Sequence, residues 1–187
     1  PGTLIAPLPA VIVSCGTMEK SNAVTVAWTG IINSIPPMLY ISLRPERYSY
    51  NIIKESGEFA INLTTSALAY ATDFCGVKSG RDIDKFEALG LEKQKANQIN
   101  CPIIAQSPLA LECKVKEIKE LGSHHMFIAD ILCVDAEEKY LGGVTNQFES
   151  EVVYHNQSVK DEGIIFTSTD DEGTFVLDGK KLPSLLF

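Results

Sequence analysis

The fold is constrained most by the stretch Met38-Leu39-Tyr40-Ile41-Ser42-Leu43-Arg44-Pro45-Glu46-Arg47-Tyr48-Ser49, in which apolar and polar side chains alternate up to a proline. Successive side chains of a β-strand point to opposite faces, so this alternation predicts a strand over residues 38–44. Its packed face would consist of Leu39, Ile41 and Leu43. Its other face, which would meet something polar, would consist of Tyr40, Ser42 and Arg44.

The segments on both sides of this stretch extend the β pattern. Residues 9–15 and 23–28 are apolar and rich in β-branched side chains, and the turn residues between them predict a hairpin. After the proline, residues 49–56 are predicted to form a short helix that Gly57 ends, and a strand is predicted over 58–63. Short strands separated by turns therefore dominate the first third of the chain.

Farther along, residues 66–91 carry Ala and charged residues without alternation, which favours helix or loop. A strand is then predicted in which Leu111, Cys113 and Val115 alternate with Glu112, Lys114 and Lys116. The mostly apolar run 124–134 predicts another strand, and short strands are also expected at 164–168 and 174–177, the latter followed by the turn Asp178-Gly179. Together these elements predict a mainly β fold, a β-barrel with short helices, and not a doubly wound sheet.

The composition suits one domain. With 187 residues, 45% hydrophobic and 21% charged, the chain can bury one sizeable core, so residues 1–187 are expected to form a single domain. Residues 142–187 form an acidic C-terminal part with eight acidic and three basic residues. The net charge of -8 argues against a nucleic acid or an acidic membrane as partner. Any bound anion must therefore be held by local groups.

The cysteines and the N-terminus indicate where the protein works. The five cysteines are an odd number and form no Cys-x-x-Cys pair, which disfavours a disulfide framework and a zinc site. The first residues resemble no signal peptide, and no apolar run could span a bilayer. A cytoplasmic protein with reduced thiols is expected.

The same Ser- and Arg-containing stretch carries the first candidate site. Ser42 and Arg44 share a strand face, and Arg47 and Ser49 lie at the start of the next helix. Two guanidinium groups, two hydroxyls and helix N-terminal N–H groups could together hold a phosphate monoester. The alternative is that both arginines are merely solvated and Ser49 is an N-cap. No Rossmann glycine motif, Walker loop or Gly-x-Ser-x-Gly elbow competes with this interpretation.

An aromatic residue and the histidines are weaker candidates. Trp28, the only tryptophan, is followed by Thr29 and then Asn33, and its ring could pack on a planar ligand. A lone tryptophan can equally belong to a core or a dimer interface. His124 follows a Gly-Ser turn, and the three histidines lack the carboxylate spacing of a metal site, so no metal is expected.

Taken together, several segments resemble the flavin reductase-like, FMN-binding split-barrel family, in particular its flavoredoxin-type branch. The similarity covers roughly residues 1–140. The matching segments are Asn22 to Asn33, Pro36-Pro37, Ser42 to Ser49, Phe74-Cys75-Gly76, Ser79 to Phe86, and Leu121-Gly122-Ser123-His124. The resemblance implies an FMN-binding split barrel that forms a homodimer, with the flavin near the interface.

Site residues follow from the matched segments. The resemblance implies that Asn22 and Trp28 lie against the ring or ribityl chain of the flavin, and that Arg44, Arg47 and Ser49 meet its phosphate. It also implies that Lys85 and His124 approach the flavin, where a cation would stabilise the reduced ring. A solvent-exposed lysine and a turn-capping histidine are the alternatives. The expected cofactor contacts are Asn22, Trp28, Thr29, Asn33, Ser42, Leu43, Arg44, Arg47, Ser49, Gly76, Lys85 and His124.

The resemblance implies an oxidoreductase that passes electrons from a donor such as NAD(P)H through bound FMN, with no catalytic side chain. An electron carrier that exchanges electrons with a redox protein partner is the first alternative, and a split-barrel binding protein without flavin is the second. The C-terminal part departs from the family pattern, because Asp171-Glu172-Gly173-Thr174-Phe175 stands where relatives have a His-Gly-Glu-Tyr-like element. The contribution of residues 142–187 to the site is therefore left open.

Overall fold

The computed structural model describes residues 2–3, 5 and 8–137, and the backbone of 168–169, 175–177 and 180–181. It divides into two compact units, residues Pro1–Asp135 and Ala136–Phe187, which are described separately. That residues 1–187 form a single domain stays a prediction. No helix among the described residues is long and apolar enough to cross a membrane.

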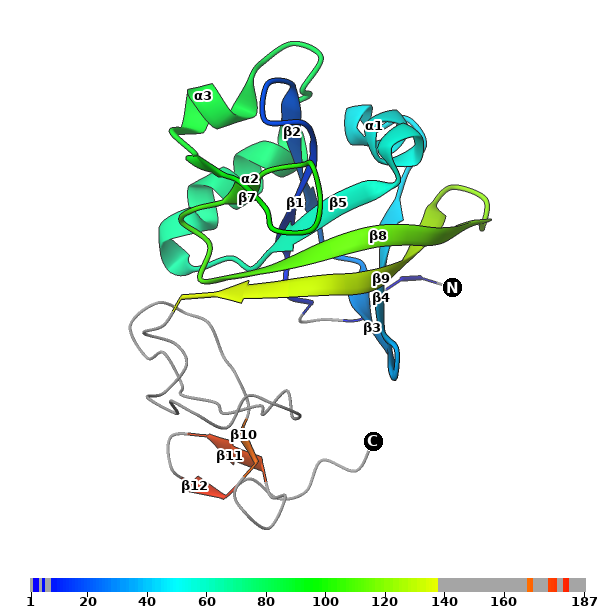
Figure 1. Cartoon of the computed structure of the whole chain (residues 1–187), viewed down its shortest axis with the longest axis vertical. Helices are drawn as coiled ribbons and strands as arrows, with labels where there is room; N and C mark the ends of the chain where they lie inside the picture. The colour runs from blue at the N-terminus through cyan, green and yellow to red at the C-terminus, as the bar shows by residue number, and fades with distance from the viewer. Residues whose placement is uncertain are drawn as a thin grey trace. The chain divides into compact units, whose positions relative to one another are not determined.

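The first unit is built on one seven-stranded sheet (Figure 1), as the mainly β prediction requires. Its strands are β1 (Val11–Gly16), β2 (Ser21–Val26), β3 (Thr29–Ser34), β4 (Pro37–Leu43), β5 (Glu58–Asn62), β8 (Leu109–Glu120) and β9 (His125–Ala136). They follow the spatial order β2-β1-β5-β8-β9-β4-β3. The pairs β1–β2, β1–β5, β5–β8, β4–β9 and β3–β4 are antiparallel. A separate two-stranded sheet joins β6 (Lys93–Gln94) to β7 (Ile103–Ile104).

The sheet closes toward a barrel because its two edge strands are consecutive in the chain. Val26 ends β2 and Thr29 begins β3, so the chain crosses from one edge to the other within two residues. Trp28 lies in this crossing, and its carbonyl oxygen accepts a 2.9 Å hydrogen bond from the backbone N–H of Ser42 on β4. Trp28 therefore belongs to the seam of the barrel. The strand predicted over residues 23–28 ends earlier, at Val26.

Short helices cover the barrel, with α2 and α3 drawn on the left of Figure 1 and α1 on the right. They are α1 (Tyr48–Ser56), the 3₁₀ turn η1 (Ser66–Leu68), α2 (Ala69–Val77) and α3 (Lys85–Leu89). Gly57 ends α1 in the left-handed conformation with φ 69°, which confirms the predicted stop. Asp84 caps α3 by accepting the backbone N–H groups of Phe86 and Glu87.

Two hydrophobic clusters hold the elements that carry the site. The apolar face predicted for β4 is confirmed, because Leu39, Ile41 and Leu43 are buried in the barrel core. A second cluster lies under α2 and α3, where Cys75 and Phe86 pack against residues of β1 and β2. Each fully buried aliphatic or aromatic side chain contributes roughly 1.5–3 kcal/mol of burial free energy. These hydrophobic clusters therefore support both the connection from β4 to α1 and the segment from α2 to α3.

The alternation predicted for β8 holds for its lysines but not for Glu112. Lys114 and Lys116 are exposed, whereas Glu112 is fully buried. The segment between β6 and β7 covers this side of β8, because the backbone N–H groups of Asn97 and Gln98 both donate to the Glu112 carboxylate. A pattern of residue types could not reveal this cover, because it comes from a segment that is distant in the chain from its partner strand.

In the second unit, β10 (Ser168–Thr169), β11 (Phe175–Leu177) and β12 (Lys180–Lys181) form a small antiparallel sheet. The pairing of Leu177 with Lys180 agrees with the predicted strand and turn in this part of the chain. The predicted turn residues 178–179, most of the strand predicted at 164–168, and the divergent element 171–174 lie outside the described residues.

Candidate functional site

A cavity of about 120 Å³ opens where three segments of the first unit meet. It is lined by residues of β2, of the connection from β4 into α1, and of the segment from the end of α2 to the start of α3: Asn22, Val24, Glu46, Arg47, Tyr48, Ser49, Val77, Lys78, Ser79, Gly80, Arg81 and Lys85. Pockets that enclose a whole drug-sized ligand measure roughly 300–1,000 Å³. This cavity therefore fits one end of a cofactor and not the whole of it.

The start of α1 forms one wall. Arg47, and not Ser49, occupies the N-cap position, and no side chain caps the helix. The Ser49 side chain is buried, and its Oγ accepts a 2.7 Å hydrogen bond from Asn22 Nδ2 on β2. The interpretation of Ser49 as an N-cap is therefore wrong. Two of the predicted site residues, from segments 27 positions apart, are instead joined by a buried hydrogen bond.

The segment between α2 and α3 forms the opposite wall and is tied to the first. Arg47 donates to the Gly76 carbonyl oxygen at 2.9 Å. Arg81 donates to the Glu46 carbonyl oxygen at 3.3 Å from both terminal nitrogens, and its guanidinium lies 5.5 Å from the centre of the Tyr48 ring. Both arginines thus have their direction fixed by backbone acceptors, although both are exposed.

Gly80 allows the two walls to approach. A Cβ atom at this position would lie 2.1 Å from Asn22 Oδ1 and 2.9 Å from a ring carbon of Tyr48. Such distances are far below van der Waals contact, so any side chain at Gly80 would displace Asn22. Glycine is required here by a close approach and not by an unusual backbone angle.

Lys85 closes the inner end of the cavity. Its side chain is 3% exposed, and its Nζ donates to the carbonyl oxygens of Ala23 at 2.7 Å and Cys75 at 2.9 Å. The alternative of a solvent-exposed lysine is therefore wrong. Burial is the largest influence and lowers the pKa of Lys85; Cys75 opposes this in part, and Arg47 adds a smaller lowering. A buried ammonium that donates to neutral carbonyl groups is stabilised by any anion that enters the cavity.

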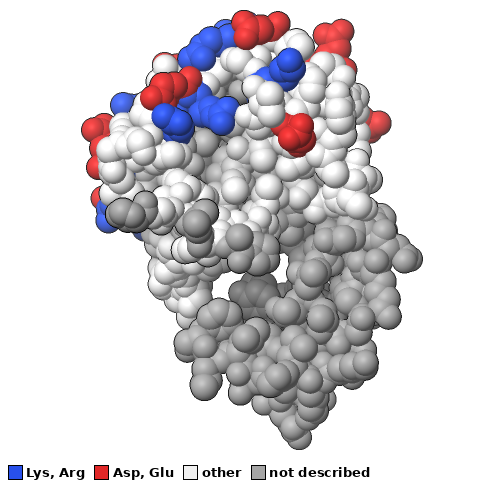
Figure 2. All heavy atoms as spheres, turned by 180° about the vertical axis from the view of Figure 1, so that it is seen from behind, with Lys and Arg blue, Asp and Glu red and all other residues white. Residues whose placement is uncertain are grey.

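The charge balance of the lining favours an anion. Four cationic side chains stand against a single carboxylate, Glu46, which also pairs with Arg44 at 3.6 Å. The cationic residues are Arg47, Lys78, Arg81 and Lys85. Such a local excess stands out in a chain of net charge -8. Figure 2 shows Lys and Arg side chains close together at the top of the described surface, with acidic side chains interspersed and around them.

The sequence predictions missed Lys78 and Arg81 as members of the lining. Their signal is the run Lys78-Ser79-Gly80-Arg81, two cations around a small residue just after a helix. That pattern is common on solvated loops. Only its contact with the start of α1, seen in the folded structure, distinguishes this run from an ordinary solvated loop.

A second group of predicted residues meets at the barrel seam. The rings of Trp28 and His124 lie 4.6 Å apart at an angle of 38°. Ser123 Oγ lies 3.1 Å from His124 Nδ1, so the histidine also contacts its own turn, as the alternative proposed. Desolvation lowers the pKa of His124, and Arg44 adds to the lowering, while Glu46 opposes it in part. A mostly neutral imidazole at neutral pH suits its packing against the indole.

The remaining predicted residues serve the barrel itself. Thr29 Oγ1 donates to the Tyr40 carbonyl oxygen at 2.6 Å and thereby joins β3 to β4. Asn33 is exposed in the β3–β4 hairpin, where its Nδ2 donates to Pro36. Leu43 is a core residue, and Ser42 is half-buried with its N–H bound to the seam. None of these four side chains lines the cavity. Their contact with a cofactor stays a prediction.

A barrel with a small cationic cavity, and with an indole and an imidazole packed together at its seam, is consistent with the class of flavin-binding redox proteins. A family described as the flavin reductase like domain matches residues 5–163. The chain belongs to this family, whose members bind flavin. The fold is the flavin reductase-like split barrel, as the resemblance implied.

Two relatives of similar sequence are named only as uncharacterised proteins. A protein of Archaeoglobus fulgidus is 30% identical over 137 residues, which are 73% of this chain and 77% of that protein. One of Aeropyrum pernix is 28% identical over 142 residues, 75% of this chain but only 54% of its own length. A stretch of 38 residues is 60% identical to an iron–sulfur cluster assembly SufBD family protein of Staphylococcus saprophyticus. That stretch covers 19% of this chain and 8% of the other, too little to assign the whole chain.

Among solved structures, the flavoredoxin of Desulfovibrio vulgaris (Miyazaki F) is 33% identical, with a TM-score of 0.70 over 75% of each chain. An FMN-binding protein from Thermus thermophilus, solved with bound 1-cyclohex-2-enone, is 22% identical. Its TM-score is 0.67 over 74% of this chain and 78% of its own, and this likeness supports the fold alone.

Proposed function

We propose that the protein is an FMN-binding oxidoreductase that takes electrons from a reduced donor such as NAD(P)H and passes them on through the bound flavin. The observation that carries the proposal is the cavity whose inner end is the buried, carbonyl-bound ammonium of Lys85. A phosphate monoester carries about two negative charges near neutral pH. It is therefore the terminal group that the cationic lining suits best, and FMN has it whereas riboflavin does not.

The residues present fit such a phosphate. The Arg47 and Arg81 guanidinium groups offer charge-assisted hydrogen bonds from the rim, and Lys85 adds charge from within. Asn22 and Ser49 provide neutral polar groups whose positions their mutual hydrogen bond fixes. Arg44 is exposed and pairs with Glu46, so we assign it the smaller share of the phosphate contact.

Trp28 and His124 are the groups we assign to the flavin ring. The indole offers an apolar face, and the imidazole, with its lowered pKa, offers a neutral hydrogen-bonding edge near neutral pH. Bound FMN supplies the electron-accepting ring, while the protein supplies grip, orientation and redox tuning. No side chain is assigned a proton transfer.

A non-enzymatic electron carrier is the second candidate, and the 33% identity to a flavoredoxin favours it. Anaerobic stopped-flow mixing of the FMN-loaded protein with NADH and NADPH separates the two. Rapid loss of flavin absorbance with either nucleotide supports the oxidoreductase. A flavin that dithionite reduces but neither nucleotide does would support the carrier. A protein that lacks flavin absorbance and does not take up FMN would contradict both and leave a non-catalytic binding protein.

We further infer that the protein is a homodimer in the cytoplasm. Large apolar side chains are exposed on β3 and its hairpin, with Ile31 61% and Ile35 90% exposed, and on β9, with Leu132 and Val134 nearly half exposed. Covering them with a second copy would remove this apolar surface from water. The cytoplasmic location is supported by the cysteines, all five of which are unpaired.

A further inference from the structure

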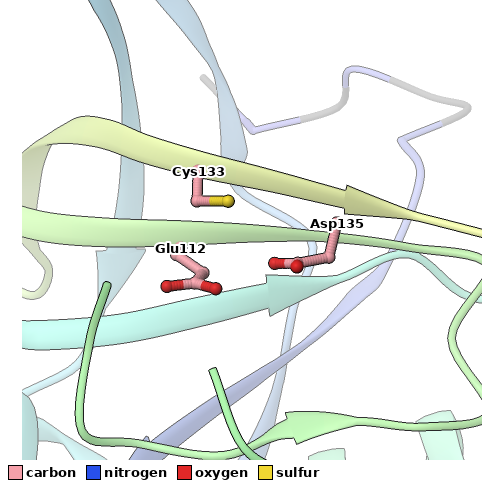
Figure 3. A group of neighbouring side chains, drawn as sticks. All are labelled: Glu112, Cys133 and Asp135. Carbon is pink, nitrogen blue, oxygen red and sulfur yellow. The ribbon is translucent and has the colours of Figure 1, made fainter. Parts of the chain in front are cut away.

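A pair of acidic side chains lies close together on β8 and β9, and none of the cavity residues is part of it. Glu112 on β8 is completely buried, and Asp135 lies near the end of β9. One carboxylate oxygen of each and the Sγ of Cys133 lie within 4.8 Å of one another. Figure 3 shows the two carboxylates pointing toward each other, with Cys133 beside them.

The hydrogen bonds of the pair leave one position without a donor. The two oxygens of Glu112 accept the backbone N–H groups of Asn97 at 2.7 Å and Gln98 at 2.6 Å. Asp135 Oδ1 accepts the side-chain amide of Asn97 at 2.6 Å. Asp135 Oδ2 is buried and has no partner among the described residues, although the Asp135 and Glu112 side chains lie within hydrogen-bonding reach. Two acceptors that meet without a donor require a proton between them.

No described cation compensates the pair. The groups that influence Asp135 are Glu112 of β8 and Asn97 of the covering segment. Burial raises the pKa of the Cys133 thiol, which neighbours Asp135 on β9, and both carboxylates add to the rise. The nearest lysines in sequence do not neutralise the carboxylate pair, because Lys114 is exposed and Lys116 pairs with Asp130 at 3.3 Å. Two ionised carboxylates this close would repel each other in a partly buried site.

We propose that Glu112 and Asp135 share one proton. Asn97 donates hydrogen bonds to both carboxyl groups, so the protonated pair holds residues 95–100 on the sheet; we call this pair with Asn97 the latch. The covering segment contributes Ala96 and Ile99 to a small buried cluster, so losing the proton would weaken its attachment. The inference is independent of flavin binding.

The direction of the pH dependence follows. Burial, with the neighbouring Glu112 acting in the same direction, raises the pKa of Asp135 to about 6. The folded protein therefore holds a proton at pH values where the unfolded chain, with an ordinary aspartate pKa of about 3.9, has lost it. The latch contributes its full stabilisation below about pH 4 and loses it as the pH rises through about 6.

The direct test is a carboxyl-carbon NMR titration of the metal-free, full-length wild-type protein, which needs no variant to fold. The result expected is that the Asp135 carboxyl signal titrates with a midpoint near pH 6. Titration of Asp135 below about pH 4.5 would overturn the proposal.

Asp135→Asn supplies the second test, because its amide can donate permanently where the shared proton lies. In thermal unfolding between pH 4 and 8, the unfolding temperature of the wild type should fall as the pH rises. This fall should be absent in the variant. Asp130→Asn, on the same strand but paired with exposed Lys116, should keep the wild-type pH dependence. The same pH dependence in all three proteins would overturn the latch.

A cation is the rival occupant of the same position. Zn²⁺ or Mn²⁺ added at pH 5, where the pair holds its proton, should leave the unfolding midpoint unchanged if a proton fills the gap. A metal-induced rise in the midpoint that Cys133→Ser abolishes would overturn the shared-proton proposal.

Discussion

Arg47 is the residue through which the proposed phosphate contact is tested most cleanly. It lines the cavity and is oriented by the Gly76 carbonyl oxygen, so truncation removes a pre-positioned charged donor. Arg47→Ala should weaken FMN binding by roughly 10- to 100-fold, since a hydrogen bond to a charged group is worth about 1.5–3 kcal/mol. Riboflavin affinity should change little. Isothermal titration with both flavins measures the difference.

Lys54→Ala is the matched control, because it removes a cation from the exposed side of the same helix. Its affinity for both flavins should equal that of the wild type. If Arg47→Ala loses FMN and riboflavin affinity equally, Arg47 does not bind the phosphate.

Gly80 offers a steric test of the same cavity. Gly80→Ala should displace Asn22 and lower FMN affinity at least several-fold, because the new Cβ would overlap Asn22 Oδ1. Gly76→Ala is its contrast: an added Cβ meets Thr25 at an ordinary 3.5 Å, and the carbonyl oxygen that binds Arg47 remains. Alanine inside a helix is favoured over glycine by about 0.5–1 kcal/mol. Fluorescence titration should therefore find binding lost in the first variant and kept in the second.

At the scale of the element, β4 carries both the core and the approach to the cavity. Ile41 is completely buried at its centre. Ile41→Ala should lower the free energy of unfolding by about 2–5 kcal/mol, measured in urea. Leu121→Ala, at a position 61% exposed in the turn between β8 and β9, should cost no more than about 0.5 kcal/mol. Equal costs would contradict the packing described for β4.

The elements also show where sequence reasoning succeeds. The strand over 38–44, the helix stopped by Gly57 and the first hairpin were predictable because they depend on short periodicities and on single turn residues. Pairings between distant segments were not. The burial of Glu112 comes from Asn97 and Gln98, and that of Lys85 from carbonyl groups of Ala23 and Cys75. No local pattern marks such partners.

The residues of the candidate site likewise include some that the sequence predicted and some that it did not. Asn22, Arg47, Ser49 and Lys85 were predicted and line one cavity, whereas Lys78 and Arg81 line it without having been predicted. The structure keeps the exposed Asn33 in its own hairpin and Leu43 in the core. A resemblance can identify a segment that matters, but it does not tell which side chain of that segment turns toward the cavity.

At the scale of the whole molecule, the exposed isoleucines predict self-association. Ile35→Glu places a charge at a position that is 90% exposed in the chain alone, so the folded monomer should tolerate it. In a dimer that buries this surface, the charge would be desolvated without a partner. Light scattering coupled to size-exclusion chromatography should give the mass of two chains for the wild type and of one for the variant. A monomeric wild type would contradict the proposed dimer.

The measurement that tests the central claim most directly is the titration of flavin-free wild-type protein with FMN and with riboflavin, in parallel and under one buffer. The phosphate cavity predicts that FMN binds at least about ten-fold more tightly than riboflavin, and that inorganic phosphate competes with FMN. Equal affinities for the two flavins, or no binding of either, would contradict it.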